Sequence, residues 1–186
     1  RRADLWAAAP PTATTATTED IDLDGENEYL LANDRVFAVF EATGGRLVAG
    51  FARNTQTGRV YQLIGTQPAF PGSDNELEGT ANVVNGAVSA HRTSGFKDWF
   101  ADGAGGASSA YVNAAYTVIS AGPNGWSFQS PDGHVVKTVT LATGSPRIKA
   151  DYQLSGDVNK LFVRMGLSPD LQSLLTRGQQ DLLVFR

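Results

Sequence analysis

Hydrophobic and polar residues alternate strictly over the segment Arg147–Leu154. The apolar members are Ile148, Ala150, Tyr152 and Leu154, and the polar members are Arg147, Lys149, Asp151 and Gln153. A period of two predicts a β-strand with one face in the core and the other in water. Leu161, Val163, Met165 and Leu167 repeat the pattern. We therefore expect Ile148, Tyr152, Leu161 and Val163 to be buried.

Short apolar or alternating runs separated by Gly, Asn, Asp and Pro turns occupy most of the remaining chain. These runs are residues 28–32, 35–41, 46–52, 59–64, 82–91, 111–120 and 126–129. About ten or more strands at this spacing predict an all-β fold, a large two-sheet antiparallel β-sandwich. A single short helix is expected near the C-terminus, over Pro169–Thr176, with Ser168 as its N-cap.

The start of the chain has a different composition. Ala7–Thr18 reads AAAPPTATTATT, a low-complexity segment that buries too little apolar surface to offset its chain entropy. We predict a Pro/Thr-rich linker over residues 1–19 and a β-sandwich domain over residues 20–186; an ordered arm lying on the domain is the alternative. Because the chain begins with Arg1 rather than Met, we interpret it as part of a larger protein.

Composition narrows the functional classes. The 186 residues include no Cys, which excludes disulfides and thiolate metal sites, and the net charge is −4. The sequence has no basic stretch typical of nucleic-acid binding, and no apolar run long enough for a membrane helix. We therefore expect neither a nucleic-acid nor a membrane partner.

An acidic loop precedes the first run of the sandwich. Its carboxylates alternate and are followed by Gly25, which permits the sharp bend that a calcium loop needs. We predict a structural Ca²⁺ whose oxygen ligands come from Asp20, Asp22, Asp24, Glu28 and the backbone carbonyl of Glu26. The alternative is a solvated acidic turn before a strand.

Two segments, Asp20–Leu47 and Tyr152–Gln179, carry a family resemblance. The first is similar to the opening of galactose-mutarotase-like β-sandwich domains attached to bacterial and archaeal glycoside hydrolases, including α-glucan-active proteins of glycoside hydrolase family 57. This opening consists of an Asp-rich loop, a strand, an Asn-Asp turn, a strand and a Gly-Gly pair. The resemblance implies a non-catalytic accessory module of a secreted bacterial protein. Its partners would be a polysaccharide, with an α-glucan as the candidate, and the catalytic module of the parent chain.

A glycan-binding module needs an aromatic ring for the apolar face of a sugar, with polar groups beside it for the hydroxyls. Trp99 is our candidate platform, and the alternative is that its ring belongs to the core. The candidate residues around it are His91, Arg92, Lys97, Asp98 and Tyr61.

Two functions of other classes remain open. One is an epimerase or lyase on the same fold, using His91 with an acid from the loop that contains Glu76 and Glu78. The other is a purely structural, calcium-stabilised spacer or adhesin domain. A nucleophile elbow of the form G-x-S-x-G is absent from the sequence.

Overall fold

A computed structural model describes residues 1–21, 23–65, 83–84, 87–88, 94–96, 98–102, 107–108 and 111–162. These residues form one helix and fourteen strands. Those of the first half are α1 (Arg2–Ala8), β1 (Thr15–Glu19), β2 (Glu28–Ala32), β3 (Val36–Phe40), β4 (Leu47–Arg53), β5 (Val60–Ile64), β6 (Val83–Val84) and β7 (Ala87–Val88). The others are β8 (Trp99–Asp102), β9 (Ala107–Ser108), β10 (Thr117–Gly122), β11 (Gly125–Gln129), β12 (Val135–Leu141), β13 (Ile148–Leu154) and β14 (Val158–Phe162).

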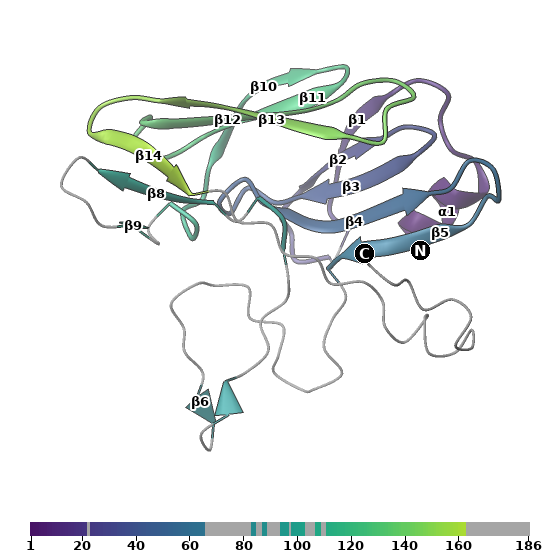
Figure 1. Ribbon diagram of the computed structural model, residues 1–186, viewed down its shortest axis with the longest axis horizontal. Helices are drawn as coiled ribbons and strands as arrows, with labels where there is room; N and C mark the ends of the chain where they lie inside the picture. The colour runs from purple at the N-terminus through teal and green to yellow at the C-terminus, as the bar shows by residue number, and fades with distance from the viewer. Residues whose placement is uncertain are drawn as a thin grey trace, which may run out of the picture.

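Two antiparallel sheets face each other across the core. One has the order β1-β2-β3-β4-β5 and the other β10-β11-β12-β13, so each is a meander in which sequence neighbours pair. Figure 1 shows the four-stranded sheet above the five-stranded one. A smaller sheet, β14-β8-β9, and the pair β6-β7 complete the described strands. The predicted antiparallel sandwich is confirmed. The helix expected at 169–176 lies outside the described residues.

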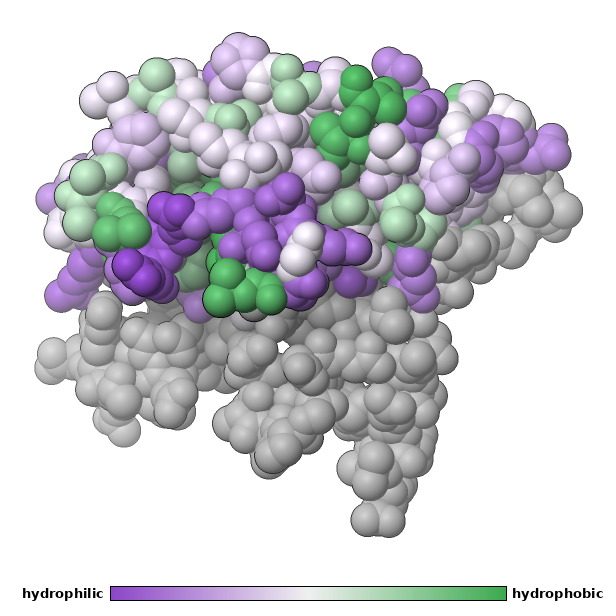
Figure 2. Space-filling view, turned by 180° about the vertical axis from the view of Figure 1, so that it is seen from behind, coloured by the Kyte–Doolittle hydropathy of each residue, from purple (hydrophilic) through white to green (hydrophobic). Residues whose placement is uncertain are grey.

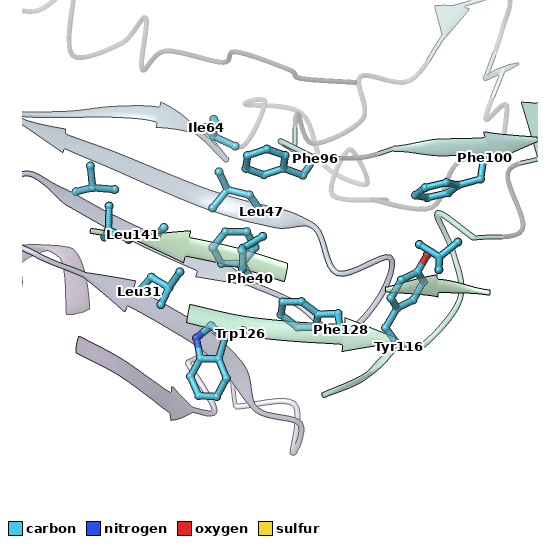
Figure 3. Close-up of a cluster of buried hydrophobic side chains, with 14 of the residues drawn as sticks. Leu31, Phe40, Leu47, Ile64, Phe96, Phe100, Tyr116, Trp126, Phe128 and Leu141 are labelled. Atoms are coloured by element: carbon cyan, nitrogen blue, oxygen red, sulfur yellow. The ribbon is translucent and has the colours of Figure 1, made fainter. Parts of the chain in front are cut away.

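The larger core cluster lies between the two main sheets. Aromatic rings dominate it: Phe40 and Phe128 are completely buried, and the indole of Trp126 lies beside them (Figure 3). The ring of Tyr29 meets those of Trp126 and Phe128 edge-on, at centroid distances of 5.3 Å in both cases. These are favourable aromatic geometries, and they join strands of both sheets.

The five-stranded sheet is buried on its other face as well. Alternate residues of β3 serve two separate clusters: Ala38 and Phe40 belong to the cluster between the sheets, whereas Phe37 and Val39 belong to a second cluster. This second cluster also contains Trp6 of α1, whose ring stacks on Phe37 with centroids 5.8 Å apart. The uninterrupted apolar run of β3 follows from this, because a strand buried on both faces has no water-facing positions.

Residues 1–19 are part of the fold, contrary to the linker prediction. Within the segment, α1 buries Trp6, whose indole nitrogen donates to the carbonyl oxygen of Asn33 at 2.7 Å. The Thr-rich stretch forms strand β1, which pairs with β2 over five residues. Arg2 binds Glu19. A Thr-rich sequence is low in complexity but high in β-propensity, and an existing sheet edge gives it a partner.

The alternation predicted over residues 147–154 is confirmed. Burial along β13 alternates between half-buried and exposed, and Arg147, Lys149 and Asp151 face water. Ile148, Tyr152 and Leu161 pack against the core but stay partly accessible, because β13 and β14 are edge strands of their sheets. Val163 lies outside the described residues.

On the face seen in Figure 2, the apolar residues form small separate patches. The described residues include five exposed large hydrophobic side chains, those of Leu5, Leu23, Leu63, Ile119 and Phe162. In the part of the chain that the structure describes, no helix has the length and apolar character needed to cross a membrane.

Candidate functional site

The predicted glycan-binding residues lie in different parts of the chain, and the structure describes only some of them. His91, Arg92 and Lys97 lie outside the described residues, as does the acidic loop with Glu76 and Glu78. Tyr61 lies half-buried on β5, an edge strand of the larger sheet. The backbone of Trp99 begins β8.

Asp98 is not a surface residue, so its assignment to a glycan site is corrected. Its side chain is 0% exposed, and one carboxylate oxygen, Oδ2, lies 3.0 Å from Nζ of Lys137. The hydroxyl of Tyr152 donates to the same oxygen. A buried carboxylate with a buried cation as partner is satisfied inside the protein, and it cannot reach a sugar at the surface.

Lys137 is the unexpected member of this cluster. It is fully buried at an inward-facing position of β12, between the inward-facing Val135 and Val139. Its Nζ also donates to the backbone carbonyl oxygens of Gly44 (3.0 Å), Gly45 (3.2 Å) and Phe96 (2.8 Å). Lys137 of the four-stranded sheet therefore holds the β3–β4 turn of the five-stranded sheet and the segment before β8.

The buried environment of Lys137 disfavours the charged form of its amine. Burial lowers the pKa of the Lys137 ammonium, and the Asp98 carboxylate offsets part of this effect. Burial also raises the pKa of the Tyr152 hydroxyl, and the negative charge of Asp98 adds to the increase. The pKa of the Tyr116 hydroxyl is raised mainly by burial, and this hydroxyl has no hydrogen-bond partner among the described residues. Both phenols are therefore neutral at physiological pH.

Sequence reasoning missed this cluster, although one signal was available. The alternation of Val135, Val139 and Leu141 places Lys137 on the inward face of its strand. A lysine at an inward position requires a buried partner. The partner itself, Asp98, is far away along the chain and could not be read from the strand pattern.

The carboxylates of the predicted calcium loop bind backbone N–H groups. Asp20 Oδ2 accepts from the backbone N–H of Gly25 at 3.1 Å, and Asp24 Oδ1 accepts from that of Glu26 at 2.8 Å. Glu28 is 7% exposed, and its Oε2 accepts from the backbone N–H of Ile21 at 2.6 Å. These three hydrogen bonds connect residues across the loop.

The fit of this loop to Ca²⁺ is incomplete. Among the described residues, no three acidic, His or Cys side chains gather closely enough to hold a metal ion. Asp22 lies outside the described residues, and Asp24 and Glu26 are exposed to solvent. The Ca²⁺ site therefore stays a prediction.

A second polar cluster closes the β11–β12 turn. Asp132 Oδ1 accepts from Ser130 Oγ at 2.5 Å and from the backbone N–H of His134 at 3.0 Å, while Oδ2 accepts from the Tyr111 hydroxyl at 2.7 Å. Nδ1 of His134 lies 3.5 Å from Oδ2. The Ser130 hydroxyl is directed at the carboxylate rather than at the imidazole, so this arrangement stabilises a turn and does not activate a nucleophile.

Phe162 is an exposed aromatic residue that sequence reasoning passed over. It ends β14, it is 46% exposed, and its position in the sheet is directly opposite Trp99 of β8. The neighbouring residue Leu161, opposite Phe100, packs against the core. An aromatic residue at the outward position of an alternating strand was the available signal.

Comparison with protein-family models, with curated proteins and with solved structures returned no match to this chain.

Proposed function

We propose that this domain is a non-catalytic carbohydrate-binding module, and that it belongs to a larger secreted polysaccharide-processing protein. The proposed ligand is a polysaccharide of the α-glucan class, bound weakly at one site. The catalytic module of the parent chain is the proposed intramolecular partner, because tethering to an enzyme makes weak binding effective.

The observation that carries the proposal is the register of β8 and β14. Phe162 is a large ring on the surface of a strand, and its partner in the adjacent strand is Trp99. Rigid aromatic residues on a strand are suited to the flat apolar face of a pyranose. The polar cluster at Asp132 favours a binding module over an enzyme, because its described groups form hydrogen bonds that stabilise a turn.

The test is retention of the folded chain in gels that contain soluble polysaccharides, with α-glucans and β-glucans compared. Phe162→Ala and Trp99→Ala should each weaken retention by about 1–3 kcal/mol in binding free energy. Ile119→Ala is the matched control, because Ile119 is 49% exposed but lies on β10 of another sheet.

Two results would contradict the proposal. If the wild-type chain passes every polysaccharide gel without delay, the module does not bind these glycans. If it is delayed but the Phe162 and Trp99 variants are delayed equally, binding takes place elsewhere on the surface.

A further inference from the structure

The contact between Lys137 and Asp98 places an amine against a carboxyl group inside an apolar core. Nζ lies 3.0 Å from Oδ2, and both side chains are 0% exposed. The carboxyl carbon Cγ is one bond beyond Oδ2. We propose that the two side chains become joined by an intramolecular isopeptide bond between Nζ of Lys137 and Cγ of Asp98, formed in the folded domain with loss of one water molecule.

The hydrogen-bond count around Nζ fits this reaction. Four oxygens lie within 3.2 Å of Nζ: three backbone carbonyls and Asp98 Oδ2. An ammonium has only three protons. If one proton moves to the carboxylate, two N–H bonds remain for the three carbonyls, and the nitrogen lone pair is free to face the carboxyl group.

Burial favours this proton transfer, because a low dielectric disfavours both charges. Desolvation lowers the pKa of Lys137, the Asp98 carboxylate offsets part of this decrease, and the Arg46 guanidinium adds a smaller decrease. The neutral amine is the nucleophilic form, and the neutral acid is the form of the carboxyl group that it can attack. Fixed contact between the two groups replaces a bimolecular encounter.

The bond changes balance without another reactant. Nζ, which gave its first proton to the contacting oxygen Oδ2, forms a bond to Cγ, and the negative charge develops on Oδ1. Oδ2, which also accepts a hydrogen bond from the Tyr152 hydroxyl, takes a second proton from the nitrogen. The carbonyl then re-forms on Oδ1 as the bond from Cγ to Oδ2 breaks, and Oδ2 leaves as water. The amide keeps one N–H for a neighbouring carbonyl.

The mass of the full chain tests the proposal directly. The intact protein should be lighter than its sequence by one water molecule. Tryptic digestion then locates the bond, because the segment Asp98–Lys137 has no Lys or Arg between its ends. Trypsin does not cleave after an acylated lysine. The bonded protein should therefore yield one cross-linked peptide, residues 98–147, in place of the separate peptides 98–137 and 138–147.

Three variants control the experiment. Lys137→Arg keeps a cation but offers no amine, so its mass should equal that of its sequence. Asp98→Asn should give the same amide with ammonia as the leaving group, so its bonded mass should equal that of the bonded wild type. Tyr152→Phe removes the hydroxyl donor but neither reacting group, and the bonded fraction should form more slowly after purification.

A folded wild-type chain with the full mass of its sequence, and with peptide 98–137 ending at an unmodified Lys137, would overturn the proposal. Water loss that persists in Lys137→Arg would also overturn it, because the lost water would then come from another site. The wild-type result decides the question even if a variant does not fold.

Discussion

The indole nitrogen of Trp126 donates a hydrogen bond to the carbonyl oxygen of Leu30, 3.1 Å away in the opposite sheet. Both residues are buried, at 6% and 5% exposure. The bond satisfies a backbone acceptor inside the core, and it connects β11 to β2. The sandwich is therefore held by a directional contact as well as by apolar packing.

Trp126→Phe should destabilise the domain by about 1 kcal/mol, because it removes the indole donor and the net contribution of its hydrogen bond to the Leu30 carbonyl. Urea unfolding monitored by circular dichroism measures the change. Thr117→Val, at an exposed position of β10, is the control and should stay within roughly 0.5 kcal/mol of wild type. A Trp126→Phe variant as stable as this control would show that the hydrogen bond contributes nothing.

Asn33 connects two turns at the same end of the sandwich. Its side chain is completely buried, and Nδ2 donates to the carbonyl oxygens of Ala142 (2.9 Å) and Ser145 (2.8 Å). Asn33→Asp replaces these donors with a carboxylate oxygen facing two carbonyl oxygens. We expect a loss of about 3 kcal/mol or more in unfolding free energy.

Asn54→Asp is the matched control for Asn33. The Oδ1 atom of Asn54 accepts from the backbone N–H groups of Gln56 and Thr57 in an exposed turn. An aspartate keeps this acceptor, so the change should stay within roughly 0.5 kcal/mol. Equal effects of the two substitutions in the same unfolding assay would contradict the assigned role of Asn33.

Asp132 gives the domain a predicted acid sensitivity. Partial burial by itself raises the pKa of Asp132, but hydrogen bonds from Ser130, from the backbone of His134 and from Tyr111 outweigh it and lower the pKa from 3.8 to about 2. A carboxyl pKa lower in the folded state stabilises the fold above pH 3.8. This contribution is lost as the pH falls towards 2.

The measurement compares wild type with Asp132→Asn by denaturant unfolding at several pH values. The wild type should be more stable at neutral pH, by no more than about 1 kcal/mol because the side chain is 43% exposed. The difference should narrow as the pH falls from 3.8 towards 2. A constant difference across this range would assign the effect to packing rather than to ionisation.

Calcium binding remains a prediction. Its test decides whether the acidic loop holds Ca²⁺ or only accepts hydrogen bonds from backbone N–H groups. If Asp20, Asp22 and Asp24 hold Ca²⁺, calorimetric titration should show binding heat, and a chelator should lower the melting temperature. Asp24→Asn should weaken that binding. Unchanged melting with Ca²⁺ and with chelator would instead leave the described carboxylates as acceptors for backbone N–H groups, as the contacts of Asp20 and Glu28 indicate.

The strand pattern was readable where residues alternate or where turn residues flank an apolar run. The alternation of β13 and the turns at Asn33-Asp34 and Gly44-Gly45 predicted β2, β3, β4 and β13 to within one residue at each end. Strand β1 was not recognised, because its threonines become a strand only when β2 supplies a pairing edge. The Lys137 cluster could not be predicted either, since its acceptors come from the β3–β4 turn and from the segment before β8.

The double burial of the five-stranded sheet has a consequence for local opening of the native state. Every residue of β3 is buried, and alternate side chains pack into different clusters, so its amides reach solvent only if both clusters open. Strand β13 is an edge strand with one face in water. Amide hydrogen exchange should therefore be slowest in β3, whose amides exchange only through near-global unfolding. It should be faster in β13, whose amides exchange through smaller openings.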